Sequence, residues 1–391
     1  MRIFQLAPVF GTAGGTETYA AWLSERLTSM GHQTAMAAAA VHAARPNNYE
    51  VTELPELAWR DVADPVAGRR RIREAVRDFR PDCVLVHGVG DGPLLRMLQA
   101  DYLTVEFVHS FSCRGQKLFR RADKTCKHPL GPRCLIDWYL GPCGTDPSPR
   151  IALASLREAR DHIEALASID LVIVGSSFMK RYLMGEGLGA DHIQIVDMTM
   201  GLAETETPAR SRESGTHLIF VGRTVYVKGI QYLIRALGLL DREYDLTIVG
   251  DGWYLAPLKD LTERLGLGGR VTFRGGLQGA DLVRACRFAD VAVVPSIYPE
   301  PSGLVVPELR SLGIPVVVTD AGGLSEWATR YSSIHIADAA NPASLAAAIR
   351  NAARGRHGSA PGRTVPPDDL LSLIEGLHTA RMQEGGVALG V

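Results

Sequence analysis

Short apolar runs alternate with helical periodicities along this chain, and the alternation occurs twice, once on each side of a polar stretch at 203–216. In the first series, the apolar run 2–8 precedes a glycine-rich loop. Apolar residues then recur at helical spacing over 17–30, and another apolar run follows at 34–41. This order of strand, loop, helix and strand is a βαβ unit. Two such series predict an α/β protein with parallel, doubly wound sheets.

The polar stretch also predicts a domain boundary, because 391 residues exceed what one hydrophobic core usually supports. We predict a Rossmann-like domain over 1–202, a linker over 203–216, a second Rossmann-like domain over 217–375 and a C-terminal tail over 376–391. The predicted strands of the second domain are 217–221, 245–249, 271–274, 290–294 and 315–319. Such sheets bind ligands at the carboxyl ends of their strands, so we expect the site in a cleft between two facing domains.

Composition and the N-terminus limit the class of protein. The formal net charge is −1, so no overall field attracts nucleic acid or an anionic membrane. The first eight residues lack the long apolar core of a signal peptide. No run approaches the roughly 18 apolar residues of a transmembrane helix. We therefore expect a cytoplasmic protein whose cysteines are mostly reduced.

A glycine-rich loop follows the first predicted strand. Gly14 and Gly15 let the backbone come close to a ligand, and the helix that begins there offers free N–H groups and a dipole that favours phosphate. A tight turn between strand and helix explains the glycines equally well. The loop lacks the G-x-G-x-x-G fingerprint, and no acidic residue convincingly closes the second strand, which argues against a dinucleotide-dependent oxidoreductase.

Two cations lie beside the end of the first strand of the second domain. Arg223 follows Val221-Gly222 directly, and Lys228 stands five positions later. An arginine can bind a diphosphate through two hydrogen bonds, and a lysine adds a point charge. A solvated loop is the alternative, but the position at the carboxyl end of a strand favours a diphosphate ligand.

The most specific pattern contains Glu300 and Glu308, two carboxylates on either side of a predicted strand-to-helix turn. Pro307 suits the first helical position, which would place Glu308 in the first turn of the helix. A carboxylate there can accept hydrogen bonds from both hydroxyls of a ribose, while Glu300 can meet a sugar hydroxyl. The backbone N–H groups of Gly303–Val305 can surround a phosphate. A helix-capping glutamate beside an exposed loop glutamate is the alternative interpretation.

Taken together, these motifs resemble those of the family 4 retaining glycosyltransferases, which have the GT-B fold of two facing Rossmann-like domains. The matching motifs, in chain order, are Gly14-Gly15-Thr16-Glu17, Gly222-Arg223…Lys228-Gly229, Val249-Gly250-Asp251-Gly252, Val271-Thr272-Phe273-Arg274-Gly275, Pro295-Ser296…Glu300-x7-Glu308 and Gly322-Gly323-Leu324-Ser325-Glu326. The resemblance is dense from 218 to 330 and looser from 42 to 200. As a set, the motifs are specific for the family but not for a substrate.

The resemblance implies a role for each matching residue. Arg223 and Lys228 would hold the donor diphosphate and stabilise it as it leaves, and Glu300 would contact the transferred sugar. His109 ends the predicted strand 103–108, where the family often has a histidine beside the donor sugar; a buried structural histidine is the alternative. The implied donor-binding residues are Gly14, Gly15, Gly303, Leu304, Val305 and Glu308.

Two positions depart from the family pattern. Ser302 stands where a phenylalanine is usual, and Leu309 stands where an alanine is usual, with Arg310 beside it. Neither change removes a charged residue, but both could reshape the sugar pocket. The motifs therefore leave the donor sugar and its base open.

The activity that the resemblance implies is transfer of a sugar from a nucleoside-diphosphate sugar to a hydroxyl, with retention of configuration and without a metal or other cofactor in catalysis. The main chemical task is to stabilise charge on the departing diphosphate. No well-placed carboxylate nucleophile is evident, so we expect a front-face, ion-pair-like route and closure of the domains on the donor. A glycan, a lipid-linked precursor and a small natural product all remain open as acceptors.

Two other functions fit the same fold. A sugar-nucleotide epimerase would not transfer sugar to an acceptor, and the Glu300-x7-Glu308 pattern favours the transferase over it. A non-catalytic protein that binds sugar nucleotides is the second alternative, and the intact pair Arg223 and Lys228 argues against it.

Four of the six cysteines fall within one segment between 109 and 143. They are Cys113, Cys126, Cys134 and Cys143. Their spacing lacks the paired C-x2-C of common zinc sites, so a structural zinc and unrelated buried thiols are both left open. Disulfides are the least favoured interpretation in a reducing compartment.

The same segment is basic. Arg114 and Lys117 belong to it, and it lies in the domain that usually binds the acceptor in this family. We expect these two residues on the acceptor side, where they could hold an anionic acceptor or rest on a membrane surface. The basic run 69–73 adds weak support for peripheral membrane contact, and a solvated loop is the alternative.

Overall fold

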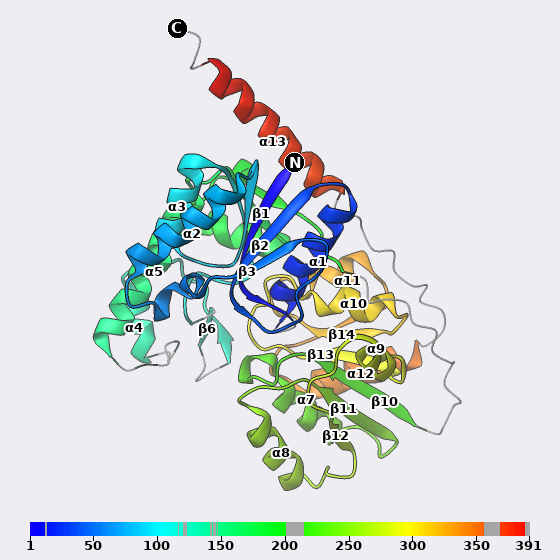
Figure 1. The fold of residues 1–391 in the computed structure, drawn as a ribbon. Coiled ribbons are helices and arrows are strands. Elements are labelled where there is room, and N and C mark those ends of the chain that lie inside the picture. Colours follow the sequence, from blue (N-terminus) through cyan, green and yellow to red (C-terminus); the bar gives the residue numbers. More distant parts are fainter. Residues whose placement is uncertain are drawn as a thin grey trace. The chain divides into compact units, whose positions relative to one another are not determined.

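The computed structural model describes residues 1–11, 14–115, 117–119, 123–140, 143, 146, 148–200, 215–355 and 368–387. The chain divides into two compact units. The first comprises Met1–Lys117, Lys127–Met198 and Pro366–Val391, and the second comprises Leu118–Cys126 and Thr199–Val365. Each unit is built on one parallel sheet flanked by helices (Figure 1).

The first unit contains a seven-stranded sheet with the order β3-β2-β1-β4-β5-β8-β9. All of its neighbouring strands pair in parallel. The chain moves outward from β1 first in one direction and then in the other, which is the doubly wound arrangement. The strands are β1 (Arg2–Phe10), β2 (Gln33–Val41), β3 (Glu50–Glu53), β4 (Cys83–His87), β5 (Leu103–Phe107), β8 (Leu171–Val174) and β9 (Ile193–Ile195).

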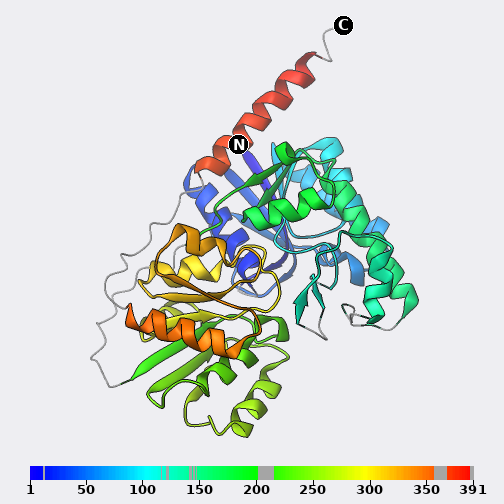
Figure 2. The same ribbon diagram turned by 180° about the vertical axis from the view of Figure 1, so that it is seen from behind.

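Helices connect these strands, as Figure 2 shows from behind. Three of them begin at a side chain that caps the free N–H groups of the first turn: Asp64, Asp91 and Ser176. The α-helices of this unit are α1 (Gly15–Ser29), α2 (Pro65–Phe79), α3 (Gly92–Asp101), α4 (Arg133–Leu140), α5 (Pro149–Leu166), α6 (Ser177–Gly185) and α13 (Asp368–Val387). Short 3-10 turns occur at η1 (Pro55–Leu57), η2 (Trp59–Asp61) and η3 (Ala190–His192).

The second unit contains a six-stranded parallel sheet with the order β12-β11-β10-β13-β14-β15. The strands are β10 (Thr216–Val221), β11 (Tyr244–Val249), β12 (Val271–Phe273), β13 (Val291–Val294), β14 (Val316–Thr319) and β15 (Ile334–Ala337). The helices are η4 (Tyr226–Lys228), α7 (Ile230–Leu237), α8 (Leu255–Arg264), α9 (Gly279–Arg287), α10 (Val305–Ser311), α11 (Glu326–Arg330) and α12 (Pro342–Arg354).

The second sheet is buried on both faces because successive side chains of a strand point to opposite sides. In β10, Leu218 and Phe220 pack into one core with residues of α7 and α12. Ile219 points the other way and packs into a second core with residues of α10 and α11. These two cores fix the strand ends that carry the residues discussed below.

The predicted fold class is confirmed. The five strands predicted for the second domain are all present, with ends within one residue of the prediction. The structure adds the edge strands β3, β9 and β15, which are short or partly exposed and lack a strong apolar run. Residues 203–214 of the predicted linker lie outside the described residues, and its last residue, Thr216, already begins β10.

The C-terminal boundary differs from the prediction of a domain end at 375 and a tail over 376–391. Helix α13 runs through that boundary and groups with the first unit. Its Arg381 donates hydrogen bonds to both oxygens of Asp170, at 2.9 and 3.0 Å, and Leu370 and Ile374 are fully buried. Residues 388–391 of the predicted tail lie outside the described residues.

A short hairpin of the basic segment groups with the second unit rather than with the domain predicted over 1–202. It consists of β6 (Leu118–Phe119) and β7 (Lys124–Thr125). Asp123, at its turn, accepts hydrogen bonds from the hydroxyls of Tyr226 and Tyr232, the former at 3.0 Å. Within the described ranges, no helix has the length and apolar character needed to cross a bilayer.

Candidate active site

An ion pair between Lys228 and Glu300 forms the centre of the predicted site in the second unit. The Nζ atom of Lys228 lies 2.6 Å from Oε1 of Glu300. The Ser296 hydroxyl donates to the same oxygen at 2.6 Å, and the Tyr298 hydroxyl donates to Oε2 at 2.9 Å. The structure therefore brings together two residues predicted from separate motifs, and it adds Ser296 and Tyr298 as their partners.

Two glycines hold this pair in place. Lys228 ends η4 and is followed by Gly229, which has φ +70°; a Cβ atom there would lie 1.9 Å from the carbonyl oxygen of Pro295. On the other side, Gly322 has φ +67°, and a Cβ atom there would lie 2.6 Å from the carbonyl oxygen of Glu300. Both approaches of backbone to backbone require glycine, so the motif glycines position the ion pair.

The surroundings of Glu300 favour its ionised form. Burial alone would raise the pKa of this carboxyl, which is only 5% exposed. The Lys228 ammonium and the hydrogen bonds from Lys228, Ser296 and Tyr298 outweigh burial and hold the pKa of Glu300 below its ordinary value. The result is a fixed negative charge beside a lysine that keeps further N–H donors.

Arg223 lies exposed just beyond the end of β10. Among the residues that the structure describes, its guanidinium has no hydrogen bond or ion pair, and its charge partly offsets the rise that burial causes in the pKa of Tyr298, the tyrosine that donates to Glu300. A cation that is held near a strand end without a protein counterion is available to bind an anion.

Glu308 lies in the first turn of α10, as predicted, but the helix begins at Val305 and not at Pro307. Burial raises the pKa of Glu308 to about 7, because no cation among the described residues offsets the loss of water. This carboxyl therefore titrates near neutral pH. In contrast to Glu300, it changes its charge in the range where most enzymes work.

The backbone between these carboxylates also follows the motif. Gly303 has φ +67°, and Val306 N–H donates to its carbonyl at 2.9 Å, so the preceding N–H groups open the helix. The residues at the two departures from the family pattern make contacts within the second unit. The carbonyl of Ser302 accepts a hydrogen bond from Trp327 at 2.7 Å, and Arg310 lies 3.7 Å from the centre of the Tyr331 ring.

The glycine loop of the first unit begins α1. Gly14 is the residue before the helix, and its carbonyl accepts hydrogen bonds from the N–H and the hydroxyl of Thr18. Gly15 is exposed at the first helical position, where N–H groups have no partner within a helix. The loop residues 12 and 13 lie outside the described residues.

His109 follows β5 and stacks among aromatic rings. Its ring centroid lies 5.8 Å from that of His87 and 6.1 Å from that of Tyr19 on α1. Burial lowers the pKa of His109 to about 4, so the ring is neutral at pH 7. Within the described residues, its Nε2 atom is shielded from solvent and has no hydrogen-bond partner. An unpaired buried nitrogen is costly, which favours a ligand over a purely structural role.

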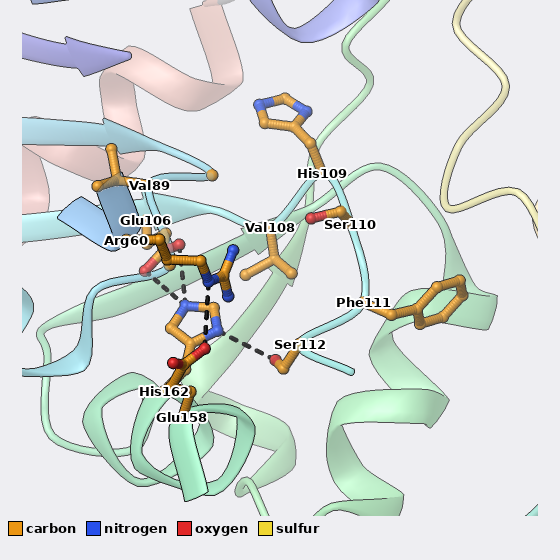
Figure 3. A pocket seen from close by; sticks show the side chains of 12 residues that line it. Arg60, Val89, Glu106, Val108, His109, Ser110, Phe111, Ser112, Glu158 and His162 are labelled. Carbon is orange, nitrogen blue, oxygen red and sulfur yellow. Dashed lines mark hydrogen bonds and ion pairs between the residues drawn. The ribbon is translucent and has the colours of Figure 1, made fainter. Parts of the chain in front are cut away.

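A pocket opens beside His109 within the first unit, between the loop after β4, the end of β5 and helix α5 (Figure 3). At its base, Nε2 of His162 lies 3.2 Å from Glu106, which is fully buried in β5. Nδ1 of the same ring lies 3.0 Å from the Ser112 hydroxyl. None of these three residues was predicted from the sequence, although a carboxylate inside the apolar strand 103–108 is a signal that could have pointed to them.

Arg60 and Glu158 form an ion pair of 3.1 Å that also lines this pocket. Arg114 lies 3.3 Å from the same carboxylate oxygen of Glu158, so two guanidinium groups share one acid. Both arginines keep side-chain exposures of about 40%. Arg114 therefore lies beside a pocket of the first unit, and its role on the acceptor side stays a prediction.

Lys117 differs from the prediction of an acceptor-binding cation. Its side chain is 9% exposed, and its ammonium pairs with Glu186 at 3.2 Å and donates to the carbonyl of His128. The basic run of α2 is also largely paired, since Arg69, Arg71 and Arg73 bind Asp91, Glu56 and Asp101. Lys117 is thus turned inward, whereas Arg71 and Arg73 pair with acids at the surface, with side chains 70% and 50% exposed.

The structural zinc left open for the cysteine segment is not supported. Within the described residues, Cys113, Cys126, Cys134 and Cys143 form no disulfide. Across the described part of the chain, no three His, Cys, Asp or Glu side chains gather in a way that could hold a metal ion.

Comparisons with known proteins identify the family. Residues 204–359 match the family "Glycosyl transferases group 1", and residues 14–198 match the "Glycosyl transferase 4-like domain". A D-inositol 3-phosphate glycosyltransferase of an Arthrobacter species is 28% identical over 72% of this chain and 63% of its own length. The first curated relatives are matched over 28% to 41% of their lengths.

Solved structures give the same fold. A sucrose-phosphate synthase from Thermosynechococcus elongatus superposes with a TM-score of 0.69 at 17% identity, over 99% of this chain and 98% of that one. Anabaena HepE in complex with UDP-glucose superposes with a TM-score of 0.63 at 18% identity, over 90% and 89% of the two chains. With the two parallel sheets and the ordered motifs, these matches show that the chain belongs to the group 1 (family 4) glycosyltransferases of GT-B fold.

Proposed function

We propose that this chain transfers a sugar from a nucleoside-diphosphate sugar to a hydroxyl group of an acceptor, with retention of configuration and without a catalytic metal. The observation that carries the proposal is the Lys228–Glu300 pair at 2.6 Å, with Arg223 nearby and unpaired among the described residues. Departure of a diphosphate develops negative charge, and preorganised cations lower the free energy of that transition state.

The donor's parts are distributed over the motif residues. Arg223 and Lys228 bind the diphosphate, and the N–H groups of Gly14, Gly15 and Gly303–Val305 complement its charge. Glu308 accepts hydrogen bonds from the ribose hydroxyls. Glu300 and the neutral Nε2 of His109 meet the hydroxyls of the transferred sugar. UDP is the first nucleotide to try, since UDP-glucose is the ligand in the HepE complex.

The acceptor side is assigned to the first unit, where Arg114 and Arg60 share Glu158 at a pocket. Two guanidinium groups and one carboxylate leave one positive charge, which suits an acceptor that carries an anionic group. A lipid-linked acceptor also agrees with the exposed apolar side chains of Ile136 and Leu140 on α4, which would allow peripheral contact with a membrane.

The test is a thermal-shift screen with UDP, GDP, ADP, dTDP and their sugars. A nucleotide at 100 times its dissociation constant stabilises a folded protein by about 2.7 kcal/mol. We expect one nucleotide to raise the melting temperature of the wild type, and we expect Arg223→Ala and Glu308→Ala to lose that shift. Arg264→Ala, which removes an exposed arginine on α8, is the matched control and keeps it.

Product analysis then separates the alternatives. Incubation with the preferred nucleotide sugar yields a glycosylated acceptor, or slow hydrolysis to free sugar, if the chain is a transferase. An epimerised nucleotide sugar would identify an epimerase instead. Binding without either product, in protein that is folded by circular dichroism, would identify a non-catalytic binding protein.

A further inference from the structure

The cluster of Glu106, His162 and Ser112 in the Figure 3 pocket is not among the residues assigned to the donor above. It links three elements, because Glu106 lies in β5, Ser112 in the loop after it, and His162 on α5. Dashed lines in Figure 3 join the three side chains in series. Such a series of hydrogen bonds has a direction, because each group in it must act as either donor or acceptor.

Glu106 sets that direction. Its carboxylate is fully buried and lies 3.2 and 3.4 Å from Nε2 of His162 through its two oxygens. A buried carboxylate accepts hydrogen bonds and costs much free energy without a donor, so Nε2 must carry the hydrogen. We take the ring as neutral, so that Nδ1 is the acceptor for the Ser112 hydroxyl, which lies 3.0 Å away.

Ser112 therefore has its own hydrogen engaged and its oxygen lone pairs left for another donor. The buried Tyr182 hydroxyl can donate to one of these lone pairs. Because Ser112 is half-buried and lines the pocket, the other lone pair is open to a donor on a molecule in the pocket. An anion at this point would meet the lone pairs of Oγ with the Glu106 charge behind them. A hydroxyl group of the ligand, in contrast, can donate its hydrogen to Oγ of Ser112 and extend the series of hydrogen bonds. The apolar side chains of Val108 and Phe111 lie beside it and can contact the C–H face of a sugar or cyclitol ring.

We propose that this pocket binds a hydroxyl of the acceptor, with Ser112 as the contact and His162 and Glu106 as positioning residues. The inference rests on the proposed transferase function and extends it. The part of the acceptor beside Ser112 is a polyol. Arg60 and Arg114 can hold an anionic group at the other end of the same acceptor. An acceptor hydroxyl that donates its hydrogen to Ser112 keeps a lone pair on its oxygen free to bond to the transferred sugar.

The first test uses full-length protein with ¹⁵N-labelled histidine, in which His162→Asn identifies the His162 signals. We expect Nε2 to carry the hydrogen in the wild type. Glycerol, myo-inositol, glucose and mannose serve as probes, and we expect at least one of them to shift the Nδ1 signal of His162. Loss of one neutral hydrogen bond predicts that Ser112→Ala weakens that probe about tenfold.

Two variants serve as controls. Ser112→Thr keeps the hydroxyl and restores the affinity for the probe. Ser29→Ala removes an exposed hydroxyl at the end of α1, outside the pocket, and leaves the affinity unchanged. The inference is overturned if none of the four polyols moves the His162 signal, or if the probe binds wild type and Ser112→Ala equally.

The outcome is independent of the nucleotide screen. If no nucleotide binds, the proposed function fails, whereas binding of a polyol at His162 still reports on the pocket. Once a donor is known, Ser112→Ala and His162→Gln are expected to raise the KM of the acceptor about tenfold while the KM of the donor stays constant. A merely structural role would alter both constants or neither.

Discussion

Glu106 in the first unit and Glu300 in the second are both buried near the carboxyl end of a strand, but they have different partners. Glu300 meets the ammonium of Lys228, together with two hydroxyl donors. Glu106 meets the imidazole of His162, whose far nitrogen contacts Ser112. The first arrangement holds a permanent pair of opposite charges, and the second transmits the polarity of a carboxylate to a hydroxyl. Burial of the same side chain can thus serve a charged ligand or a neutral one.

Lys228→Met gives the largest expected effect. It leaves the Glu300 carboxylate buried without its cation, and breaking a buried pair costs about 3 to 5 kcal/mol in the free energy of unfolding. Denaturant titration measures the loss. Lys228→Met with Glu300→Gln should recover part of it, because no charge is then left alone. Equal stability of the single and double variants would contradict the charged nature of the cluster.

Nucleotide affinity should change with pH through Glu308. Its pKa is raised to about 7, so its ionised form, which accepts from both ribose hydroxyls, becomes populated as pH rises. We expect affinity to increase about 25-fold between pH 5.5 and 7.5, following the ionised fraction of a single group. Isothermal titration calorimetry across this range measures it, and Glu308→Gln should bind with an affinity that does not depend on pH.

The same residue should affect stability in the opposite sense. A carboxyl with a raised pKa favours the protonated folded state, so its contribution is present at low pH and is lost as pH rises through about 7. As pH rises from the ordinary glutamate pKa of 4.5 to about 7, wild type without nucleotide should therefore lose stability relative to Glu308→Gln. A constant difference between the two proteins would place the pKa of Glu308 elsewhere.

Glu106→Gln should cost less than loss of Lys228. The amide oxygen can still accept from Nε2 of His162, so the hydrogen bond survives without its charge, at a cost of about 1 kcal/mol in the free energy of unfolding. Thermal unfolding of Glu106→Gln beside Lys228→Met gives the comparison directly. A loss as large as that of Lys228→Met would mean that the first-unit cluster also depends on a full ion pair.

The smallest expected effect belongs to an exposed pair. Arg71 binds Glu56 with its own side chain 70% exposed, and pairs of this kind contribute under about 1 kcal/mol. Arg71→Ala should therefore leave both unfolding and nucleotide binding nearly unchanged, as seen by denaturant titration and thermal shift. A clear loss of membrane or acceptor binding in this variant would restore a functional role to the basic run of α2.

The fold was predictable because it depends on the periodicity of apolar residues and on glycines that no other residue can replace. The buried strands β13 and β14 are nearly continuous apolar runs, and Gly229 and Gly322 belong to motifs with fixed spacing. The cluster of Glu106, Ser112 and His162 in the first unit was not predicted because its members are far apart in sequence. Glu106 is hidden in an apolar run, and a histidine on an apolar helix face is usually structural.

Three features differ from expectation for a related reason. Charge alone suggested an acceptor-side role for Lys117, but its ammonium is turned inward to Glu186. Nearness in sequence left a zinc site open, but within the described residues no three side chains gather there in a way that could hold a metal ion. The C-terminal helix resembles a tail because its sequence has no clear apolar period, yet Leu370 and Ile374 are fully buried. For Lys117 and the C-terminal helix, a partner distant in sequence decided the outcome.

The interleaving of the two units limits how this protein can be recombined with relatives. The chain passes from one unit to the other at 117–118, 126–127, 198–199 and 365–366. A chimera made with a single crossover near 200 would separate Asp123 from the two tyrosine hydroxyls that it accepts from, and α13 from Asp170. Exchange of donor specificity between family members therefore requires transplanting the 118–126 hairpin with the second unit and leaving the last helix with its original host.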